Sequence, residues 1–434
     1  MIIASNADRL AITTDLWKAI NNCHFMGITC HWITPKFELE SATLSLAKFN
    51  GPKTAENIRE LLLKILDEWE ITKKVVAVVA DNAANNVKAF QSVMHLGCTA
   101  HTVQLSVKLV LERIDSLLRT CTSITEFLHR SSEAEVTLFH FQRAEGKAEE
   151  KIPTSVETRW NSSYEMMQAL LAHRPSIERT MQKYMRNCLS GDEWTMLEEV
   201  VNFLEIPADI TTQLSGSNYV SISLIYPMIR GWLMYLGEFK SESRIMNQLR
   251  DSIVADVKTR WNDKDMAIFC VAASMLDPRF KQLNFASKQE KDIAKDFVLA
   301  RMKSVMSCPE AEKPKPKPTV PKMKIWQYMV GADEMEEDNT PAGLRHELDL
   351  YLGGPVAAQH VNPLSFWIEH KERYPNLYIV ARQLLCVPSS SVPSESLFST
   401  AGDTLTKKRN RMSEESLEAQ VFLYKNYDLI SKYN

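Results

Sequence analysis

The sequence predicts a mixed fold, in which an α/β region is followed by a mostly helical one. In roughly the first quarter of the chain, short segments rich in Thr, Ile, Val and aromatic residues alternate with turn residues, a pattern typical of strands. From about Leu105 to Met302, apolar residues recur at helical spacing. Because the two patterns occupy separate stretches, we expect a sheet-containing core in residues 1–104 and a helical domain in residues 105–304.

Three strand-like segments come first, over Leu10–Trp17, Met26–Thr34 and Ala42–Phe49. A helix is predicted next, because TAENIRELLLKILDEWEI carries an apolar stripe behind Thr54, a residue type that caps helices. The following VVAVV, from Val75, is apolar throughout and predicts a strand buried on both faces. This is the opening order of an RNase H-like sheet, and the order alone fits other α/β folds as well.

The fourth predicted strand ends abruptly at Asp81, which a cluster of asparagines follows. Open α/β sheets place their ligands beyond the carboxyl ends of the strands, so Asp81 is a candidate functional residue. An Asp in this position also serves as a turn former or as a helix N-cap. The segment alone leaves both interpretations open.

The composition limits the class of protein. The 434 residues carry a net charge of −3, so any nucleic-acid surface must be local. The eight cysteines form neither a CxxC pair nor a disulfide-framework spacing, which favours a reducing compartment. We expect no membrane span and no signal peptide, because apolar runs of about 18 residues and a basic start before an apolar core are both missing.

A change in composition precedes the last part of the chain. Residues 305–341 contain PEAEKPKPKPTVPKMK and GADEMEEDNT, which cannot bury enough apolar surface to fold alone, so we predict a disordered linker. Helical periodicity returns in residues 342–434. The last predicted helix carries Leu417, Val421 and Tyr424 on one apolar stripe. We therefore expect the helices from about Leu344 onward to pack against the helical domain and, with it, to form a self-association surface.

Five motifs in order resemble those of hAT-family transposases, in the branch that includes vertebrate BED zinc-finger proteins. They are TTDLW, VVADNAANNVKAF, LGCTAHTVQLSVK, TRWNSSYEMM and the long final VPSSSVPSESLFSTAGDTLTKKRNRMSEESLEAQVFLYKN. The resemblance implies an RNase H-like catalytic core interrupted by a large helical insertion domain. It also implies that residues 342–434 form the dimerisation region and complete the core.

The resemblance further implies three acidic residues that hold divalent metal, and these match Asp15, Asp81 and Glu395. Cleaving a phosphodiester requires an activated attacking oxygen and a stabilised leaving oxygen, which paired Mg²⁺ ions provide. Mg²⁺ prefers carboxylate and water oxygens, so the expected cofactor is Mg²⁺ or Mn²⁺. The alternative for Glu395 is an ordinary acid on the solvent side of a helix.

Arg159 and Trp160 match a family element whose Trp is implied to stack on a DNA base extruded at the transposon end. Such stacking is worth roughly 1–3 kcal/mol per base. A stacking ring must be at least partly exposed, so we expect an exposed Trp160. The alternative is a Trp that anchors the helical domain.

Cys98 and His101 form a CxxH pair. Zinc needs three or four ligands, and no partner pair lies nearby in the sequence, so we expect no zinc in this chain. The resemblance implies instead a role close to the DNA or in shaping the active site.

A basic cluster follows the predicted helix of Glu395, and consists of Lys407, Lys408, Arg409 and Arg411. These side chains suit DNA phosphates or a nuclear-import signal. A solvated turn before the last helix is the alternative.

The resemblance implies a nuclear hAT-type DNA transposase or transposase-derived DNA-binding protein, with DNA and a second copy of itself as partners and no small-molecule substrate. An active enzyme would cut one strand at the element's end, and the new 3′-hydroxyl would attack the opposite strand and leave a hairpin on flanking DNA. The alternative is a domesticated, non-catalytic dimerising regulator of transcription or chromatin. Family members carry a BED zinc finger before the first catalytic Asp, and fourteen residues precede Asp15 here. We therefore expect a fragment, a shortened product or dependence on partners.

Overall fold

The computed structural model describes residues 2–20, 22–156, 159–216, 218–306, 341–405 and 412–433. The chain forms two compact units. The sheet unit consists of Met1–Cys98, Gly216–Met228 and Asp263–Asn434, and the helical unit consists of Thr99–Ser215 and Ile229–Asn262. No helix among the described residues has the length and apolar character that a membrane span requires.

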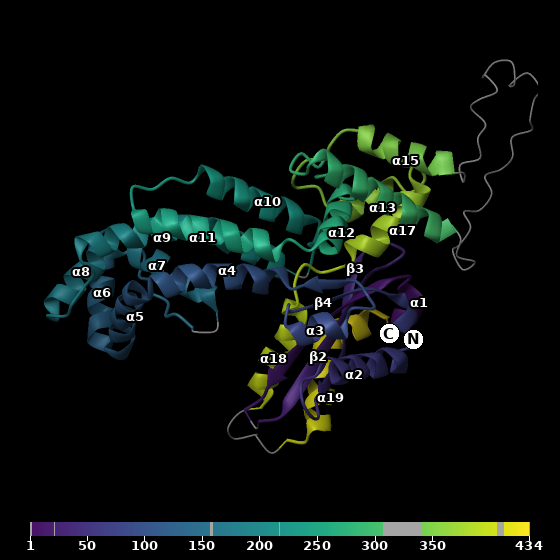
Figure 1. The fold of residues 1–434 in the computed structure, drawn as a ribbon. Coiled ribbons are helices and arrows are strands. Elements are labelled where there is room, and N and C mark those ends of the chain that lie inside the picture. The colour runs from purple at the N-terminus through teal and green to yellow at the C-terminus, as the bar shows by residue number, and fades with distance from the viewer. Residues whose placement is uncertain are drawn as a thin grey trace, which may run out of the picture. The chain divides into compact units, whose positions relative to one another are not determined.

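A five-stranded sheet forms the centre of the sheet unit (Figure 1). Its strands are β1 (Leu10–Lys18), β2 (His24–Ile33), β3 (Leu39–Lys48), β4 (Val75–Ala80) and β5 (His95–Gly97). The spatial order is β3-β2-β1-β4-β5, in which β1 is antiparallel to β2 and parallel to β4. The three strands, the helix and the buried fourth strand thus occur in the predicted order, and the mixed α/β class is confirmed.

One face of the sheet is apolar and is covered by α2 (Ala55–Glu68). The helix begins where the sequence predicts, because the Thr54 hydroxyl accepts a hydrogen bond from the Asn57 N–H at 3.3 Å. Its buried side chains, including Ile58 and Leu62, join Ile12 and other strand residues in one hydrophobic cluster. Burial of this apolar surface is the main stabilising contribution on this face.

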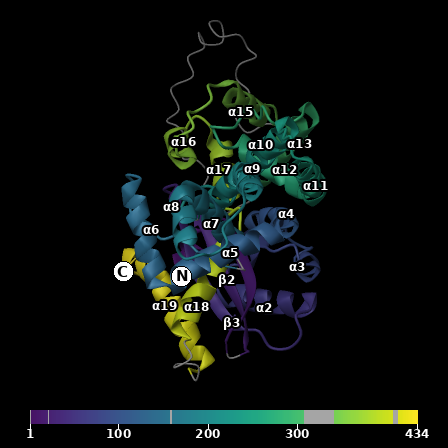
Figure 2. The same ribbon diagram turned by 90° about the vertical axis from the view of Figure 1, so that its left-hand side faces the viewer.

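Three C-terminal helices cover the opposite face. They are α17 (Pro375–Leu385), α18 (Val392–Thr404) and α19 (Glu414–Tyr433). Helix α18 packs on β1 and β2, and α19 packs on β3; Figure 2 shows α18 and α19 beside β2 and β3. Chain segments from opposite ends of the sequence therefore build one domain.

Helix α19 is attached to the edge strand β3 by a buried side-chain amide. Asn426 accepts a hydrogen bond from the Thr43 N–H and donates one to the Thr43 carbonyl, both at 2.9 Å. The amide thus satisfies backbone groups that an edge strand leaves unpaired. An ion pair between Lys48 and Glu414, 2.6 Å long, joins the start of α19 to the end of β3.

The apolar stripe of α19, which we expected to take part in self-association, is partly buried and partly exposed in the structure. Leu417 and Val421 are buried in a cluster with Leu397 and Phe398 of α18, whereas Tyr424 is 71% exposed. The expectation for Leu417 and Val421 was therefore wrong. Helical spacing identifies a buried face of a helix, but it does not distinguish burial within the same chain from burial against a partner.

The sheet unit also contains helices on both sides of the undescribed residues 307–340, where almost all of the predicted linker lies. They are α12 (Lys264–Met275), α13 (Lys288–Met306), α15 (Pro341–Gly353) and α16 (Pro363–Glu369). Helix α13 packs on α15 and α17. Residues 263–304, expected in the helical domain, accordingly belong to the sheet unit, because their apolar faces meet the C-terminal helices.

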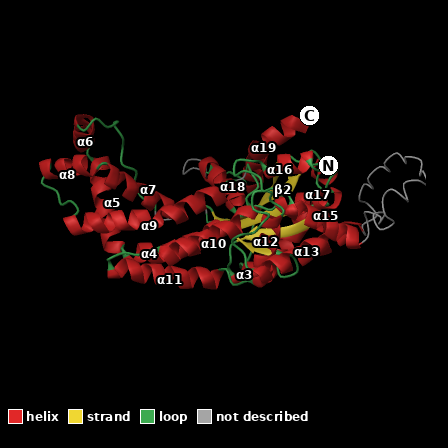
Figure 3. Cartoon of the chain, turned by 90° about the horizontal axis from the view of Figure 1, so that it is seen from above, coloured by secondary structure: helices red, strands yellow, loops and turns green. Residues whose placement is uncertain are grey.

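The helical unit contains α4 (Thr99–Arg113), α5 (Asp115–Arg130), α6 (Ser132–Ala144), α7 (Trp160–Ala172), α8 (Arg174–Lys183), α9 (Gly191–Ser215) and α11 (Arg244–Arg260), and α10 (Ile222–Glu238) runs from one unit into the other. Figure 3 shows this succession of helices. Two short helices, α1 (Ile2–Asn6) and α3 (Ala84–Ala89), belong to the sheet unit.

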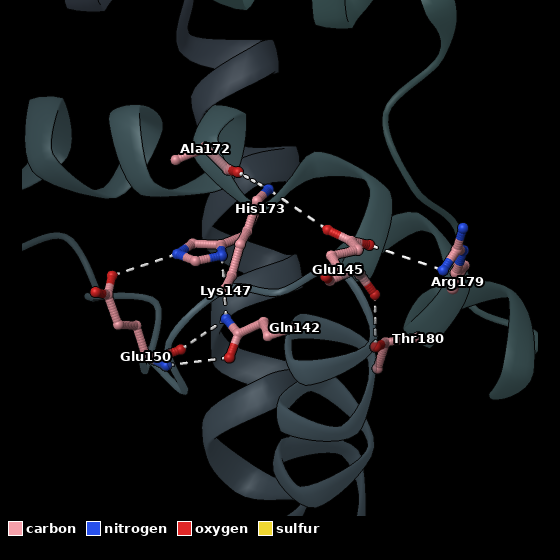
Figure 4. A network of polar contacts seen from close by, with 9 residues as sticks. Gln142, Glu145, Lys147, Glu150, Ala172, His173, Arg179 and Thr180 are labelled. Atoms are coloured by element: carbon pink, nitrogen blue, oxygen red, sulfur yellow. Dashed lines mark hydrogen bonds and ion pairs between the residues drawn. The ribbon is translucent and has the colours of Figure 1, made fainter.

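A buried glutamine fixes the segment that joins α6 to α7 (Figure 4). Gln142 donates a hydrogen bond from Nε2 to the Glu150 carbonyl and accepts one at Oε1 from the Glu150 N–H, both at 3.0 Å. The His173 ring lies 3.2 Å from Gln142 Nε2 and 3.4 Å from Glu150 Oε2. These contacts satisfy buried polar groups and hold α6 and α7 in place.

Candidate functional site

Asp15 and Asp81 lie at the same end of two neighbouring parallel strands. The last paired residues of β1 and β4 are Thr13 and Val79. Asp15 follows Thr13 by two positions, and Asp81 follows Val79 by two positions. Parallel strands keep the same direction, so both carboxylates lie at one edge of the sheet, at the carboxyl end of β4. This is the region in which open α/β sheets bind ligands.

A glycine on β2 allows α18 to come close to Asp15. Gly27 pairs directly with Asp15, and a Cβ atom added there would lie 2.8 Å from the Phe398 ring and 3.2 Å from the Ser394 carbonyl oxygen. Any larger residue would therefore push α18 away from the sheet. Trp17 stacks on the same Phe398 ring, with centroids 5.7 Å apart and planes at 13°.

Glu395 is in the first turn of α18, as expected, and the helix has its Pro at the start, where no backbone hydrogen bond is lost. Its side chain is exposed. The Ser391 hydroxyl donates to Glu395 Oε1 at 3.3 Å, while the Ser391 N–H donates to Cys98 Sγ at 3.3 Å. Cys98 thus supports the beginning of the helix that carries Glu395.

The three acids interact electrostatically. Burial, the largest cause, and the negative charges of Glu395 and Asp81 together raise the pKa of the Asp15 carboxyl to about 7. A hydrogen bond from the Leu16 N–H, 2.8 Å long, and the positive charge of Lys53 act in the opposite direction. Three residues from distant stretches are therefore brought to one site, although Glu395 follows Asp81 by more than 300 positions.

Asp81 is both a turn former and a member of this acidic site. Its Oδ1 accepts hydrogen bonds from the Ala83 N–H at 2.9 Å and from Asn86 Nδ2 at 2.6 Å. The two interpretations left open by the sequence are thus compatible. Asn86 is buried, so its hydrogen bond fixes the orientation of the Asp81 carboxylate. Both of these hydrogen bonds go to Oδ1 and not to Oδ2.

The donor types suit Mg²⁺ or Mn²⁺, because carboxylate oxygens are the ligands these ions prefer, and a cation would relieve the repulsion that contributes to the raised pKa of Asp15. Among the described residues, however, no group of three or more His, Cys, Asp or Glu side chains is arranged to hold an ion.

Trp160 is only 6% exposed, so the expectation of an exposed ring was wrong. It begins α7, and Tyr164 and Met167 are buried with it. These positions are separated by four and three residues, which is the sequence signal for the buried face of a helix. The motif match favoured a DNA-stacking role instead. Arg159 beside it is exposed.

The remaining predicted DNA contacts differ in placement. Cys98 is 1% exposed and cannot touch DNA directly in this conformation, whereas its bond to Ser391 fits the alternative of shaping the site. His101 is half-buried at the start of α4. Lys407, Lys408, Arg409 and Arg411 lie outside the described residues.

Sequence reasoning missed three residues that position the site: Gly27, Asn86 and Ser391. Asn86 belongs to the asparagine cluster after Asp81, so its proximity was a usable signal. Gly27 and Ser391 carried none, because their importance depends on the docking of α18 on the sheet.

Comparison with protein families gives three matches in consecutive order. Residues 13–107 match the ZBED1 RNase-like domain, residues 96–203 the ZBED1 RNase-like helical domain, and residues 347–427 the hAT family C-terminal dimerisation region. The first and third matches contain the acidic residues Asp15, Asp81 and Glu395.

Similar proteins align along nearly the whole chain. The Putative AC transposase of Zea mays is 25% identical over 95% of this chain and 56% of its own length. Zinc finger BED domain-containing protein 4 of Homo sapiens is 23% identical over 96% of this chain and 37% of its own length. The Putative transcriptional regulator tpeD of Talaromyces stipitatus is 21% identical over 96% of this chain and 54% of its own length.

The chain thus spans about half the length of these relatives, or less. The matches nevertheless agree in kind and follow one another along the sequence. The chain is similar to hAT transposases and BED zinc-finger proteins along nearly its whole length.

Proposed function

We propose that this chain is a hAT-type DNA transposase or a transposase-derived DNA-binding protein, with an RNase H-like core and a helical insertion. The strand order of the sheet supports the core, as does the match to an RNase-like domain. The insertion is supported by the chain order, because segments of the sheet unit precede and follow those of the helical unit. DNA is the proposed substrate, and the nucleus is the proposed location.

The observation that carries the proposal is the convergence of Asp15, Asp81 and Glu395 at one end of the sheet. We assign strand cleavage to these residues, with Mg²⁺ or Mn²⁺ as cofactor. When bound, paired divalent ions would activate the attacking oxygen and stabilise the leaving oxygen. Within the chain, Asn86 orients Asp81, Ser391 bonds to Glu395, and Gly27 allows the helix of Glu395 to approach the strand of Asp15, which supports this assignment.

The proposed reaction has two steps at one site. Water attacks the phosphodiester at the element's end, the bond between phosphorus and the 3′ oxygen breaks, and a 3′-hydroxyl and a 5′-phosphate result. That 3′-hydroxyl then attacks a phosphodiester of the opposite strand, whose bond to its own 3′ oxygen breaks; a hairpin forms on flanking DNA, and a 3′-hydroxyl is released on the element's end.

The test is metal-dependent nicking of DNA by the purified protein. A supercoiled plasmid carrying candidate element ends should be nicked with Mg²⁺ or Mn²⁺, and Asp81→Asn should abolish the activity. Glu68→Gln is the matched control, because Glu68 is an exposed acid on α2 in a surface ion pair with Lys64. Nicking that survives in Asp81→Asn would contradict the catalytic assignment.

A second candidate is a domesticated, non-catalytic dimerising regulator. One relative is named a putative transcriptional regulator, and Glu395 is exposed in the first turn of a helix, as an ordinary surface acid would be. DNA binding and self-association without nicking under any divalent ion would favour this function.

A further inference from the structure

One lysine outside the three sequence motifs that contain the acids acts electrostatically on Asp15. Lys53 lies in the segment between β3 and α2 and is exposed. Its positive charge acts on Asp15 and opposes the effects of burial, Glu395 and Asp81 on that carboxyl. The ammonium group therefore lies close enough to Asp15 for its charge to act on that carboxyl.

The backbone around Lys53 is held to the element that follows Asp81. Asn85 Nδ2 donates a hydrogen bond to the Lys53 carbonyl at 2.6 Å. On the other side, Asn57 Nδ2 and the Thr54 N–H both donate to the Pro52 carbonyl at 2.8 Å. These bonds tie the segment to α3 and to the first turn of α2, so the fold fixes the backbone of Lys53 next to the helix that follows Asp81.

The side chain of Lys53 makes no hydrogen bond and no ion pair with the part of the chain that the structure describes. Nearby lysines differ in this respect: Lys88 pairs with Glu56 at 2.9 Å, and Lys64 pairs with Glu68 at 3.9 Å. A cation whose charge acts on Asp15, but whose ammonium group bonds to no carboxylate of the described residues, remains available to an incoming anion.

The acidic site alone would repel a DNA phosphate, because phosphate and carboxylates carry the same charge. A positive group fixed at the site lowers this repulsion and stabilises charge on the phosphate oxygens during transfer. We propose that Lys53 is a phosphate-binding residue, whose ammonium group contacts the DNA phosphate presented to Asp15, Asp81 and Glu395. The inference deepens the proposed function and rests on it.

The proposal has a signature that a merely structural role would lack. Lys53 attracts the phosphate, but it also competes with divalent cations for the same carboxylates. Lys53→Met should therefore weaken DNA binding and strengthen metal binding. A general loss of structure would weaken both.

The experiment measures both affinities in Lys53→Met and in the control Lys64→Met. Binding of a short fluorescent DNA duplex is measured by anisotropy in Ca²⁺ at several salt concentrations, and Mn²⁺ binding is measured by calorimetry without DNA. We expect a several-fold loss of duplex affinity in Lys53→Met, a salt slope of log K smaller by about 0.9, and several-fold tighter Mn²⁺ binding. Lys64→Met should match the wild type in all three, and Lys53→Arg should retain the salt slope.

Equal salt slopes in Lys53→Met, Lys64→Met and the wild type would overturn the proposal. So would weaker Mn²⁺ binding together with weaker duplex binding in Lys53→Met. Neither arm requires cleavage: a wild type that binds the duplex but does not nick DNA would refute the catalytic function, while the salt slope would still decide the role of Lys53. If Lys53→Met does not fold, Lys53→Gln replaces it and is judged by the same slope.

Discussion

The two faces of the sheet differ in composition and in the origin of the helices that cover them. The face toward α2 is built from Leu10, Ile12 and other apolar residues, and α2 follows β3 directly in the chain. The face toward α17–α19 carries buried Thr13, Thr29 and His31. Its helices begin more than 300 positions after β3.

The difference shows how stability and chemistry are separated in this domain. Apolar contacts are non-directional and tolerate variation in detail. On the polar face, the Thr13 and Thr29 hydroxyls lie 2.6 Å apart, and the Thr29 hydroxyl lies 2.8 Å from His31 Nε2. Burying a polar group costs free energy unless it forms a hydrogen bond, so the side chains of this polar face can pack in only one arrangement. Asp15 points to the same side of β1 as Thr13, which places the candidate site on this polar face.

The largest expected effect on stability concerns the apolar face. Leu62→Ala should lower the free energy of unfolding by about 2–5 kcal/mol, because it removes a buried side chain and leaves a cavity. The adjacent Leu63 is the control, since it is 42% exposed while Leu62 is 4% exposed. Leu63→Ala should change stability by only about 0.5 kcal/mol. Urea unfolding measures both, and similar losses would show that α2 does not anchor this face.

An intermediate effect is expected on the polar face when the pH falls. Burial lowers the pKa of His31 to about 3, so in the unfolded chain this residue binds a proton below about pH 6.5, and in the folded protein it does not until about pH 3. The unfolded state therefore binds more protons in this window, and the contribution of His31 to stability falls by up to about 1.4 kcal/mol per pH unit on acidification.

The variant His31→Gln isolates this contribution, because Asp15 titrates in the same range with the opposite sign. Between pH 7 and pH 5, unfolding midpoints of the wild type should fall relative to those of His31→Gln. His140→Gln is the control, since His140 is exposed on α6. Parallel pH profiles of wild type and His31→Gln would show that the polar face does not depend on a neutral His31.

The smallest effect on stability is expected on the exposed side of α19, which does not pack on the sheet. Tyr424 and Tyr427 are 71% and 69% exposed and belong to the part of the chain that matches a dimerisation region. Replacing both with Ser should change the free energy of unfolding by only about 0.5 kcal/mol each, yet lower the mass measured by light scattering toward that of a monomer. An unchanged oligomer mass would place the self-association surface elsewhere.

The sequence by itself determined the first four strands, the start of the first long helix and the three acidic residues proposed for the site. Alternation and apolar runs predicted β1 to β4, Thr54 predicted the start of α2, and motif matches selected Asp15, Asp81 and Glu395. These signals are local, because backbone geometry imposes the two- and 3.6-residue periods wherever an element forms.

Only the tertiary structure decided which elements meet. It placed α12 and α13 with the C-terminal helices, buried Trp160, buried Leu417 and Val421 while leaving Tyr424 exposed, and let the charge of Lys53 act on Asp15. A periodic pattern records that one face of an element is buried, but not what covers it. Contacts between residues hundreds of positions apart arise when whole elements dock, which depends on the shapes and hydrogen-bonding groups of both surfaces together.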